Sequence, residues 1–564
     1  MLVHYQITDL KLLSHTKNRT IHVTLEMQYM IYDYIIIGAG SAGCLLANRL
    51  SANPANKVLL IEAGGPDKKM EIHIPAGYAK LHRSKVDWGG YWTEPQQHVL
   101  NRKIYLPRGK VLGGSSSTNA MAYVRGNKED YNDWAAMGNI GWSYEEVLPY
   151  FKKSENNEDI ANAYHGQNGE LTVGFAKRFN TPFASAFINA CNQCGFAKNN
   201  DYNGAQMEGA GPFQFTIKDG KRQSSAVAFL KPVISRTNLT VMTNTHTKKI
   251  IIENDKAVGV EVMTGKNATE QIRANKEIIL SAGSFASPQL LLLSGIGDRE
   301  ELTSLGIACI NHLPGVGKNL QDHLFYPVSA TTNLQLGQNH HLKPANQLAD
   351  LINYLVFKKG ALTIGPLEAV AFGSTSTSLS RVNYQLHFAS FCGGDKYDYD
   401  FHNYKTFPVN QDGFSILPTL LKPTSRGYVS LRSKNPFDYP IIQPNFLSEE
   451  SDKQVLIEVG KKAIEIAEAA AFTPYRKQLI YPPDCSSDEA ILLHIQKSVE
   501  TVYHPVGTCK MGLDETAVVD AALRVHNIEN LRVVDASVMP TIVSGNTNAP
   551  VYMIAEKAAT MILK

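Results

Sequence analysis

The chain has 564 residues, of which 43% are hydrophobic and 19% are charged, a composition typical of ordinary globular proteins. Its 55 Lys and Arg residues nearly balance its 52 Asp and Glu residues, without a long run of one sign, so neither nucleic-acid binding nor a polybasic membrane anchor is indicated. The length exceeds that of one compact core, and we expect two domains.

Seven cysteines are scattered without the spacing of a disulfide framework, which favours a reducing, cytoplasmic setting. The one close pair, Cys191 and Cys194, has helical spacing and no second pair, so we interpret it as two buried helix residues and predict no metal site. Residues 1–30 form an N-terminal extension without a sustained apolar core, and neither a signal peptide nor a membrane span is expected there. Peripheral contact with the inner face of the cytoplasmic membrane stays open.

The first predicted unit is a strand, a glycine turn and a helix. Residues 34–37 form an apolar, β-branched run, and Gly38, Gly40 and Gly43 follow in the spacing G-x-G-x-x-G. The first glycine permits the turn, the second lets a pyrophosphate approach the backbone, and the third lets the helix pack on the strand. Ser41 lies at the start of the helix, whose N-terminus faces the phosphates.

The next predicted strand, residues 58–61, ends at Glu62. A carboxylate at this point can accept hydrogen bonds from both hydroxyls of an adenosine ribose, and it favours an unphosphorylated ribose. A glycine turn alone is a weak signal, but the flanking strands and the acid complete the pattern. The sequence therefore predicts a bound dinucleotide, without separating FAD from NAD.

A long loop over residues 64–97 is predicted to cover this cofactor. It leads into a glycine- and serine-rich segment in which Gly113, Gly114 and Ser115 offer hydrogen-bond donors and Arg108 adds a positive charge. A rigid segment of this length more often cradles an anion or a ring system than forms a simple turn.

Farther along, one amphipathic helix is predicted over residues 130–153 and another helix begins at 224–230. A meander of strands follows, at 238–243, 249–253 and 257–262. A buried strand at 277–281 then leads into a second glycine turn and helix, 282–297. From 324 to about 499, alternating strand-like stretches indicate a substrate domain.

Taken together, these motifs resemble the glucose-methanol-choline (GMC) flavoprotein oxidoreductases from about residue 33 to residue 564. Besides the glycine turn, the resemblance rests on P-R-G-K-x-L-G-G-S-S-x-x-N, G-S-x-x-S-P-Q-L-L-x-x-S-G-I-G, H-P-x-G-T and G-N-T-N-A-P. Within that family the chain is most similar to proteobacterial alcohol dehydrogenases and choline dehydrogenases. The resemblance implies an α/β fold: a Rossmann-like FAD-binding domain built from discontinuous segments, plus an α+β substrate domain with an antiparallel sheet.

The implied FAD-binding domain comprises residues 31–155, 221–323 and 500–564. The implied substrate domain comprises the segments between them, 156–220 and 324–499.

The resemblance implies FAD rather than NAD as the cofactor. In such proteins the loop from Arg108 to Asn119 lines the pyrophosphate and the flavin ring, and Asp535 holds the ribityl and phosphate region. The remaining implied cofactor contacts are Met121, Thr247 and Asn546. Some members carry a histidine that is joined covalently to the flavin at the position of Thr118, so we predict non-covalent FAD here.

Alcohol oxidation needs a base of near-neutral pKa within hydrogen-bond reach of the substrate hydroxyl. The resemblance implies His504 as this base. Asn548 matches the partner position, where an amide can donate to the developing alkoxide. Asn546 is the rival for that role, and its alternative role is turn or cap chemistry in G-N-T-N.

Choline would require aromatic faces with a nearby carboxylate. The four tryptophans lie outside the implied substrate domain, which offers Tyr354, Phe357, Phe372 and Tyr397 instead. Glu368 lies where the family often has an acid, but we interpret it as a structural hydrogen-bonding residue and the four aromatic residues as core. We therefore expect a primary alcohol, oxidised with a quinone or other electron acceptor. Choline dehydrogenase is the alternative, followed by an oxygen-using oxidase or a hydroxynitrile lyase. The sequence does not predict the oligomeric state.

Overall fold

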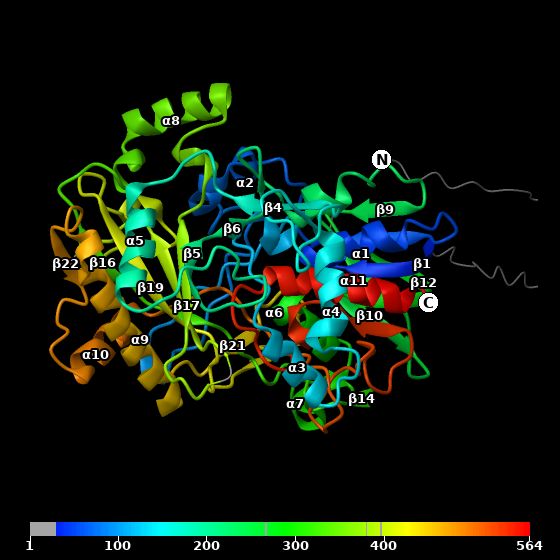
Figure 1. The fold of residues 1–564 in the computed structure, drawn as a ribbon. Helices are drawn as coiled ribbons and strands as arrows, with labels where there is room; N and C mark the ends of the chain where they lie inside the picture. Colours follow the sequence, from blue (N-terminus) through cyan, green and yellow to red (C-terminus); the bar gives the residue numbers. More distant parts are fainter. Residues whose placement is uncertain (1–29, 266–267, 380, 395–396) are drawn as a thin grey trace, which may run out of the picture.

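The structure is a computed structural model, and it describes residues 30–265, 268–379, 381–394 and 397–564. The predicted N-terminal extension lies outside the described residues except for Met30. Two large sheets form the body of the described chain, and helices pack on both of them (Figure 1).

The first sheet has seven strands. Its parallel strands, in spatial order, are β12 (Ala268–Leu280), β1 (Met30–Ile37), β2 (Val58–Ile61) and β9 (Leu239–Met242), and β24 (Leu531–Val533) also pairs parallel with β12. Beyond β12 the sheet continues with the antiparallel strands β11 (Lys256–Thr264) and β10 (His246–Glu253). Every residue of β2 is buried, as expected for a parallel strand covered on both faces.

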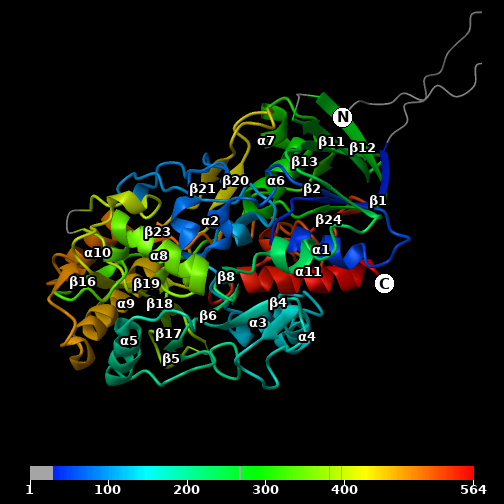
Figure 2. The same cartoon turned by 90° about the horizontal axis from the view of Figure 1, so that it is seen from above.

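Helices from both ends of the chain meet on this sheet. α1 (Ser41–Leu50) packs against α11 (Asn548–Ile562), and Arg49 of α1 forms an ion pair with Glu556 of α11 at 2.5 Å (Figure 2). α6 (Gly283–Leu293) packs against β10. The β–turn–helix order predicted for residues 34–62 and 277–297 is therefore present in both places.

The region predicted as one helix, 130–153, forms two. α3 (Lys128–Ala136) ends before Gly138, and α4 (Tyr144–Ser154) begins after Gly141. Both glycines have φ near +90°, a conformation that ends a helix and that glycine adopts without strain. A capping box at Ser143 then starts the second helix.

The predicted meander also differs from the structure. The segment 238–243 does not join it, because β9 instead extends the parallel sheet beyond β2. The antiparallel meander consists of β10, β11 and β12. The helix predicted to begin at 224–230, just before the meander, is a π-helical segment at Ala226–Leu230.

The second sheet has eight strands, and all its pairs are antiparallel. The main path is β22 (Gln478–Tyr481), β16 (Val328–Thr331), β19 (Gly413–Leu420), β18 (Tyr384–Ala389), β17 (Ala369–Gly373) and β5 (Gly209–Pro212). The short strands β15 (Leu324–Phe325) and β23 (Glu500–Thr501) join it at β19. This is the antiparallel sheet that the family resemblance implies, whereas the exact domain boundaries stay a prediction.

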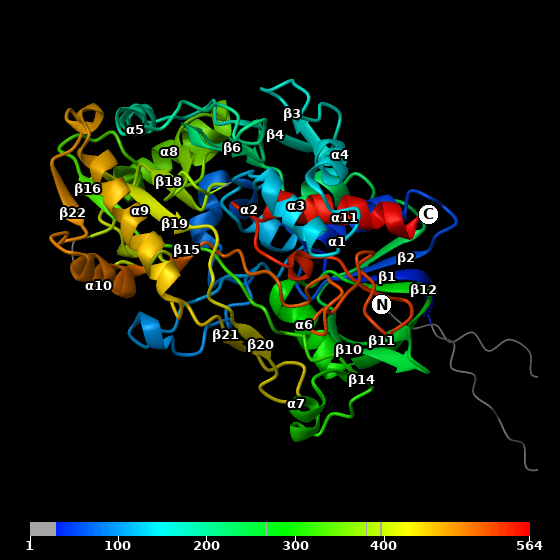
Figure 3. The same ribbon diagram turned by 60° about the horizontal axis from the view of Figure 1, so that its bottom comes forward.

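Helices cover this second sheet unevenly. α5 (Pro182–Gln193) packs on β17, α9 (Glu450–Glu468) packs on β19, and α10 (Asp488–Ser498) packs on α9 (Figure 3). α8 (Pro344–Phe357) instead stands out from the body of the molecule (Figure 1). Cys191 is buried in α5, as predicted, whereas Cys194 is half-buried and caps the end of that helix, so the prediction of two buried helix residues is confirmed for Cys191 alone.

Shorter elements connect these parts. The helical ones are α2 (Met70–His73), α7 (Arg299–Ser304), η1 (Pro75–Lys80), η2 (Gln97–Val99), η3 (Gly114–Ser117), η5 (Asn339–Leu342), η6 (Ala361–Thr363), η7 (Tyr404–Thr406), η8 (Ala470–Phe472) and η9 (Ala536–Val538). The short strands are β3 (Glu155–Asn157), β4 (Leu171–Phe175), β6 (Gln214–Phe215), β7 (Ile217–Lys218), β8 (Lys221–Arg222), β13 (Ile296–Gly297), β14 (Asn311–His312), β20 (Tyr428–Ser430) and β21 (Ile441–Gln443). Among the described residues, no helix has both the length and the apolar character needed to cross a membrane.

Candidate active site

One cavity of about 450 Å³ gathers most of the predicted site residues. Its walls come from the β1–α1 turn, the loop around residues 107–122, β10, α6, β18 and the C-terminal segments near 504 and 546. Of the residues predicted from the sequence, only Gly43 and Gly113 do not line it. A Cβ at Gly43 would lie 1.9 Å from the carbonyl oxygen of Gly38, so this glycine serves the close packing of α1 on the turn.

The β1–α1 end of the cavity fits the ADP part of a dinucleotide. Glu62 accepts hydrogen bonds from the backbone N–H groups of Ala39 at 2.9 Å and Gly64 at 2.8 Å, which aims its carboxylate along the cavity wall. Burial raises the pKa of Glu62 to about 7. A Cβ at Gly40 would meet only the carbonyl oxygen of Ser281, at 3.8 Å, so its backbone borders open space where a pyrophosphate can approach.

Two buried hydroxyls in this wall have no hydrogen-bond partner among the described residues. They are the side chains of Thr247 on β10 and Ser281 at the end of β12, and both line the cavity. Buried hydroxyls are nearly always hydrogen-bonded in folded proteins. These two are therefore available to a bound cofactor.

Asp535 lines the cavity and is held by hydrogen bonds from protein groups, while its predicted contact with the cofactor stays a prediction. One carboxylate oxygen accepts from the Ser537 N–H at 2.9 Å, and the other accepts from the Gly283 N–H at 2.9 Å and the Ser287 hydroxyl at 2.6 Å. The carboxylate thus joins the start of α6 to the start of η9. Asp535 shapes the cavity wall through these protein contacts.

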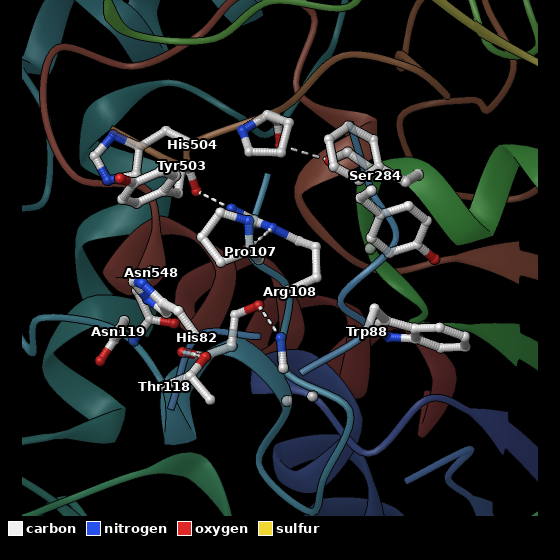
Figure 4. Close-up of a pocket in the computed structure, with 18 of the residues that line it drawn as sticks. His82, Trp88, Pro107, Arg108, Thr118, Asn119, Ser284, Tyr503, His504 and Asn548 are labelled. Atoms are coloured by element: carbon white, nitrogen blue, oxygen red, sulfur yellow. Dashed lines mark hydrogen bonds between the residues drawn. The ribbon is translucent and has the colours of Figure 1, made fainter. Parts of the chain in front are cut away.

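Arg108 connects the glycine- and serine-rich loop to the C-terminal segment. Its backbone N–H donates to Asp87 at 3.1 Å. Its guanidinium donates to the backbone carbonyl of Tyr503 (Figure 4). On the other side of the same peptide, the N–H of His504 donates to Asp322 at 2.8 Å. The peptide between Tyr503 and His504 is therefore held from both sides.

The imidazole of His504 lies between two polar partners. Its Nδ1 is 3.0 Å from Nδ1 of His323, and its Nε2 is 3.2 Å from the amide nitrogen of Asn546. His323 in turn places its Nε2 3.0 Å from the carbonyl oxygen of Leu421. These contacts form a chain from a backbone carbonyl, through two histidines, to an amide in the cavity.

This series of hydrogen bonds shows which ring nitrogens carry the protons. A carbonyl only accepts, so His323 carries its proton on Nε2 and, when neutral, accepts at Nδ1. His504 must then donate from Nδ1, which leaves a lone pair on its Nε2 facing the Asn546 amide. Burial lowers the pKa of His323 to about 3 and that of His504 well below 6.5, so both rings are neutral at neutral pH.

The structure pairs His504 with Asn546 and not with Asn548, which differs from the sequence-based choice. Asn548 accepts from the Ser41 hydroxyl at 2.7 Å and lines the cavity where α1 and α11 begin. The difference arises because Asn548 is the first residue of α11, whereas Asn546 precedes the helix and turns toward His504. The carbonyl oxygen of the Asn546 side chain is buried and has no partner among the described residues.

Two histidines of this region could not be predicted from the sequence. His323 ends the segment V-G-K-N-L-Q-D-H, and its position beside His504 arises only from tertiary structure. His387 lies on β18, lines the cavity, and has a buried Nε2 without a partner among the described residues. An isolated histidine within a strand carries no signal that sequence reasoning could have used.

Near the second sheet, apolar and aromatic side chains dominate the cavity wall. They include Phe325, Leu367, Phe391, Tyr399, Phe401, Phe407 and Leu417. Among the described residues, three carboxylates line the cavity, Glu62, Asp438 and Asp535, and each already accepts hydrogen bonds from protein groups. Glu368 does not line it, because its carboxylate accepts from Thr181 at 2.8 Å.

Comparisons with known proteins agree with this geometry. Models of the GMC oxidoreductase family match residues 32–325 and 423–555. An alcohol dehydrogenase [acceptor] of Pseudomonas putida is 44% identical over 95% of this chain and 96% of its own length. The mitochondrial choline dehydrogenase of Homo sapiens is 42% identical over 94% of this chain and 89% of its own length.

Solved structures show the same fold. Pyridoxine 4-oxidase from Mesorbium loti has 31% identity and a TM-score of 0.84, covering 94% of this chain and 98% of its own. An FAD-dependent oxidoreductase from Chaetomium thermophilum has 28% identity and a TM-score of 0.84, covering 94% of this chain and 99% of its own. The chain therefore belongs to the GMC oxidoreductase family and is an FAD-dependent oxidoreductase acting on alcohols.

Proposed function

We propose that the protein is a dehydrogenase that oxidises a primary alcohol to the aldehyde and passes the electrons to a quinone-type acceptor. The observation that carries the proposal is the position of His504, whose Nε2 lies beside the Asn546 amide in a cavity with an apolar wall and whose hydrogen bond to His323 favours an unprotonated Nε2. The Pseudomonas putida relative, named for an alcohol substrate and an unspecified acceptor, supports the same reaction class.

FAD would occupy the cavity from the β1–α1 turn toward His504. Glu62 would accept from the adenosine ribose, Gly40 and the Gly114–Ser115 backbone would face the pyrophosphate, and Thr247 would lie near the adenine. When bound, FAD supplies the acceptor for the hydrogen that leaves the alcohol carbon as hydride. Because Thr118 offers no imidazole for a covalent bond, we expect this FAD to be released by acid precipitation, leaving the protein pellet colourless.

His504 is the proposed general base. Its Nε2 takes the hydroxyl proton of the alcohol while Nδ1–H stays hydrogen-bonded to His323. The Asn546 amide, directed at the same point, donates to the oxygen as negative charge develops there, a contribution typically worth about 3 kcal/mol. Arg108 and Asp322 hold the backbone of His504, so the imidazole enters the reaction already oriented.

The lining favours a neutral alcohol over choline. A quaternary ammonium group binds best where aromatic faces combine with an available carboxylate. The cavity has the aromatic faces, but the three carboxylates that line it in the described part of the chain are engaged by protein donors, and Glu368 is turned away from it. The choline dehydrogenases among the relatives, together with the aromatic wall, keep choline as the second candidate.

An anaerobic panel of primary alcohols and choline, followed at the visible flavin band, tests the proposal. We expect rapid bleaching by a primary alcohol and slower bleaching by choline, then reoxidation by a soluble quinone faster than by air. If choline bleaches the flavin and no other alcohol does, the choline dehydrogenase proposal replaces the first one. If no alcohol bleaches the flavin, both dehydrogenase proposals fail and the hydroxynitrile lyase is tested next.

A further inference from the structure

The helix α8 exposes an apolar face. Its exposed residues are Pro344, Ala345, Leu348, Ala349, Ile352, Leu355, Val356 and Phe357. The large side chains among them are between 53% exposed, for Ile352 and Leu355, and 65% exposed, for Val356. Asp350, the one charged residue of the helix, is hydrogen-bonded to His341 at 2.7 Å and does not join this face.

This pattern is the reverse of that in an ordinary surface helix, whose exposed face is polar. Of the residues in α8, only Tyr354 is buried, and its hydroxyl donates to the carbonyl of Gly220 at 3.1 Å. Figures 1 and 2 show α8 on the outside of the molecule, above the antiparallel sheet. A contiguous apolar surface of this kind marks a site of interaction.

Lysines border one end of the apolar face. We use "basic rim" for Lys218 and Lys221 of the β7–β8 hairpin with Lys358 and Lys359, which follow α8. Arg178 ties the two parts together, because it donates to the Lys358 carbonyl at 3.2 Å and pairs with Asp219 of the hairpin at 2.8 Å. No residue of the basic rim forms an ion pair with another residue of the described chain.

We propose that α8 and the basic rim form a docking site for a lipid bilayer with anionic headgroups. A helix of 14 residues is about 21 Å long, too short to span the hydrocarbon core, and suits a position parallel to the membrane surface. In that position its apolar side chains enter the acyl boundary while the lysines contact the headgroups. A second copy of the chain fits less well, because it would cover the apolar face without supplying anionic partners for the basic rim, whereas anionic headgroups supply them.

The docking site lies close to the cavity wall, so that membrane binding would also position the cavity at the bilayer. The segment after α8 forms η6, which contacts η1, and Tyr78 of η1 lines the cavity. Docking would therefore hold the cavity wall close to the bilayer, where apolar alcohols and lipid-soluble quinones concentrate. In this respect the inference rests on the proposed quinone-type acceptor, although binding to lipid can be measured without any catalytic step.

Co-sedimentation of the full-length holoenzyme with vesicles tests the docking site. We expect binding to vesicles of phosphatidylcholine mixed with phosphatidylglycerol, and weaker binding to phosphatidylcholine alone. The double variant Leu348→Glu/Ile352→Glu should lower the partition coefficient at least about ten-fold, because two charges replace side chains that enter the acyl boundary. The matched control, Leu493→Glu/Leu513→Glu, places the same charges on other exposed leucines and should bind as the wild type does.

The lysines have a separate test. Lys358→Gln/Lys359→Gln should lower binding to the anionic vesicles by about five-fold for each lysine and leave binding to phosphatidylcholine unchanged. Flavin content and melting temperature of each variant, measured alongside, report whether the fold is intact.

The proposal is overturned if the wild type binds neither vesicle, or if the α8 variant binds as well as the control. A wild-type dimer that the α8 variant converts into a monomer, without vesicle binding, would assign the face to a second copy. Alcohol oxidation with a soluble dye and no vesicles separates the two proposals. If the protein binds vesicles but does not oxidise alcohols, only the proposed function is contradicted. If it oxidises alcohols but does not bind vesicles, only the docking site is contradicted.

Discussion

The two ends of the cavity are built in different ways. At the nucleotide end, one continuous stretch from β1 to Glu62 supplies the turn, the helix N-terminus and the carboxylate, and most of the expected cofactor contacts come from backbone groups. At the catalytic end, His323, His387, His504 and Asn546 come from four segments far apart in the chain. Changes at the first end should therefore affect how much cofactor binds, and changes at the second should affect how fast it is reduced.

The largest expected effect is at the catalytic base. His504→Ala should slow flavin reduction by the alcohol about 10²- to 10⁴-fold, because it removes the imidazole that is proposed to take the hydroxyl proton. Stopped-flow reduction under anaerobic conditions measures the rate. The visible flavin spectrum should stay as in the wild type, since the cofactor contacts lie elsewhere. Equal reduction rates in variant and wild type would remove His504 from the mechanism.

The next largest effect separates the two asparagines. Asn546→Ala should reduce kcat about 100-fold, because it removes the amide beside Nε2 of His504. Asn548→Ala is the matched control: it removes the partner of Ser41 and should mainly weaken FAD binding. The comparison is made with enzyme saturated in FAD. A larger loss of kcat in the Asn548 variant would return the role to the asparagine that the sequence favours.

The two asparagines show which features of the site could not be predicted from the sequence. The glycine turn, Glu62 and the Ser/Gly loop could be predicted because each acts through neighbouring residues and local backbone geometry. The choice between Asn546 and Asn548 depends on where α11 begins, and a shift of two residues turns a side chain to another side. The positions of His323 and His387 could not be predicted, since only the antiparallel sheet and its flanking loops bring His387 to the cavity and His323 to the ring of His504.

At the nucleotide end, Gly40→Val should raise the Kd for FAD about 10- to 100-fold. Its Cβ would project into the open space that the pyrophosphate is proposed to fill, and the branched side chain would occupy it. The reduction rate for each bound flavin should not change, in contrast to the His504 and Asn546 variants. Titration of apoprotein with FAD, monitored by quenching of flavin fluorescence, measures the Kd. A lower rate per bound flavin would show that the two ends are not independent.

His323 is expected to act through His504, as a positioning residue. His323→Ala removes the acceptor for Nδ1–H, so the imidazole loses its preferred tautomer and orientation, and kcat should fall about 10-fold. His323→Asn keeps an acceptor oxygen and should recover part of the rate. In addition, the acid limb of the kcat/KM profile should move in His323→Ala, a change that a purely structural role would not produce.

The smallest expected effect is a shift on the pH axis in the wild type. Burial, together with the nearby rings of His323 and His387 and the charge of Arg108, lowers the pKa of His504 well below 6.5. The neutral ring is the active form, so Nε2 stays unprotonated at pH values where an exposed histidine would already be charged. We expect kcat/KM, measured with a dye acceptor, to remain level as the pH falls through 6.5 and to decline only at lower pH. An acid limb at or above 6.5 would mean that the catalytic end is more open to water than its burial indicates, and would weaken the contrast between the two ends of the cavity.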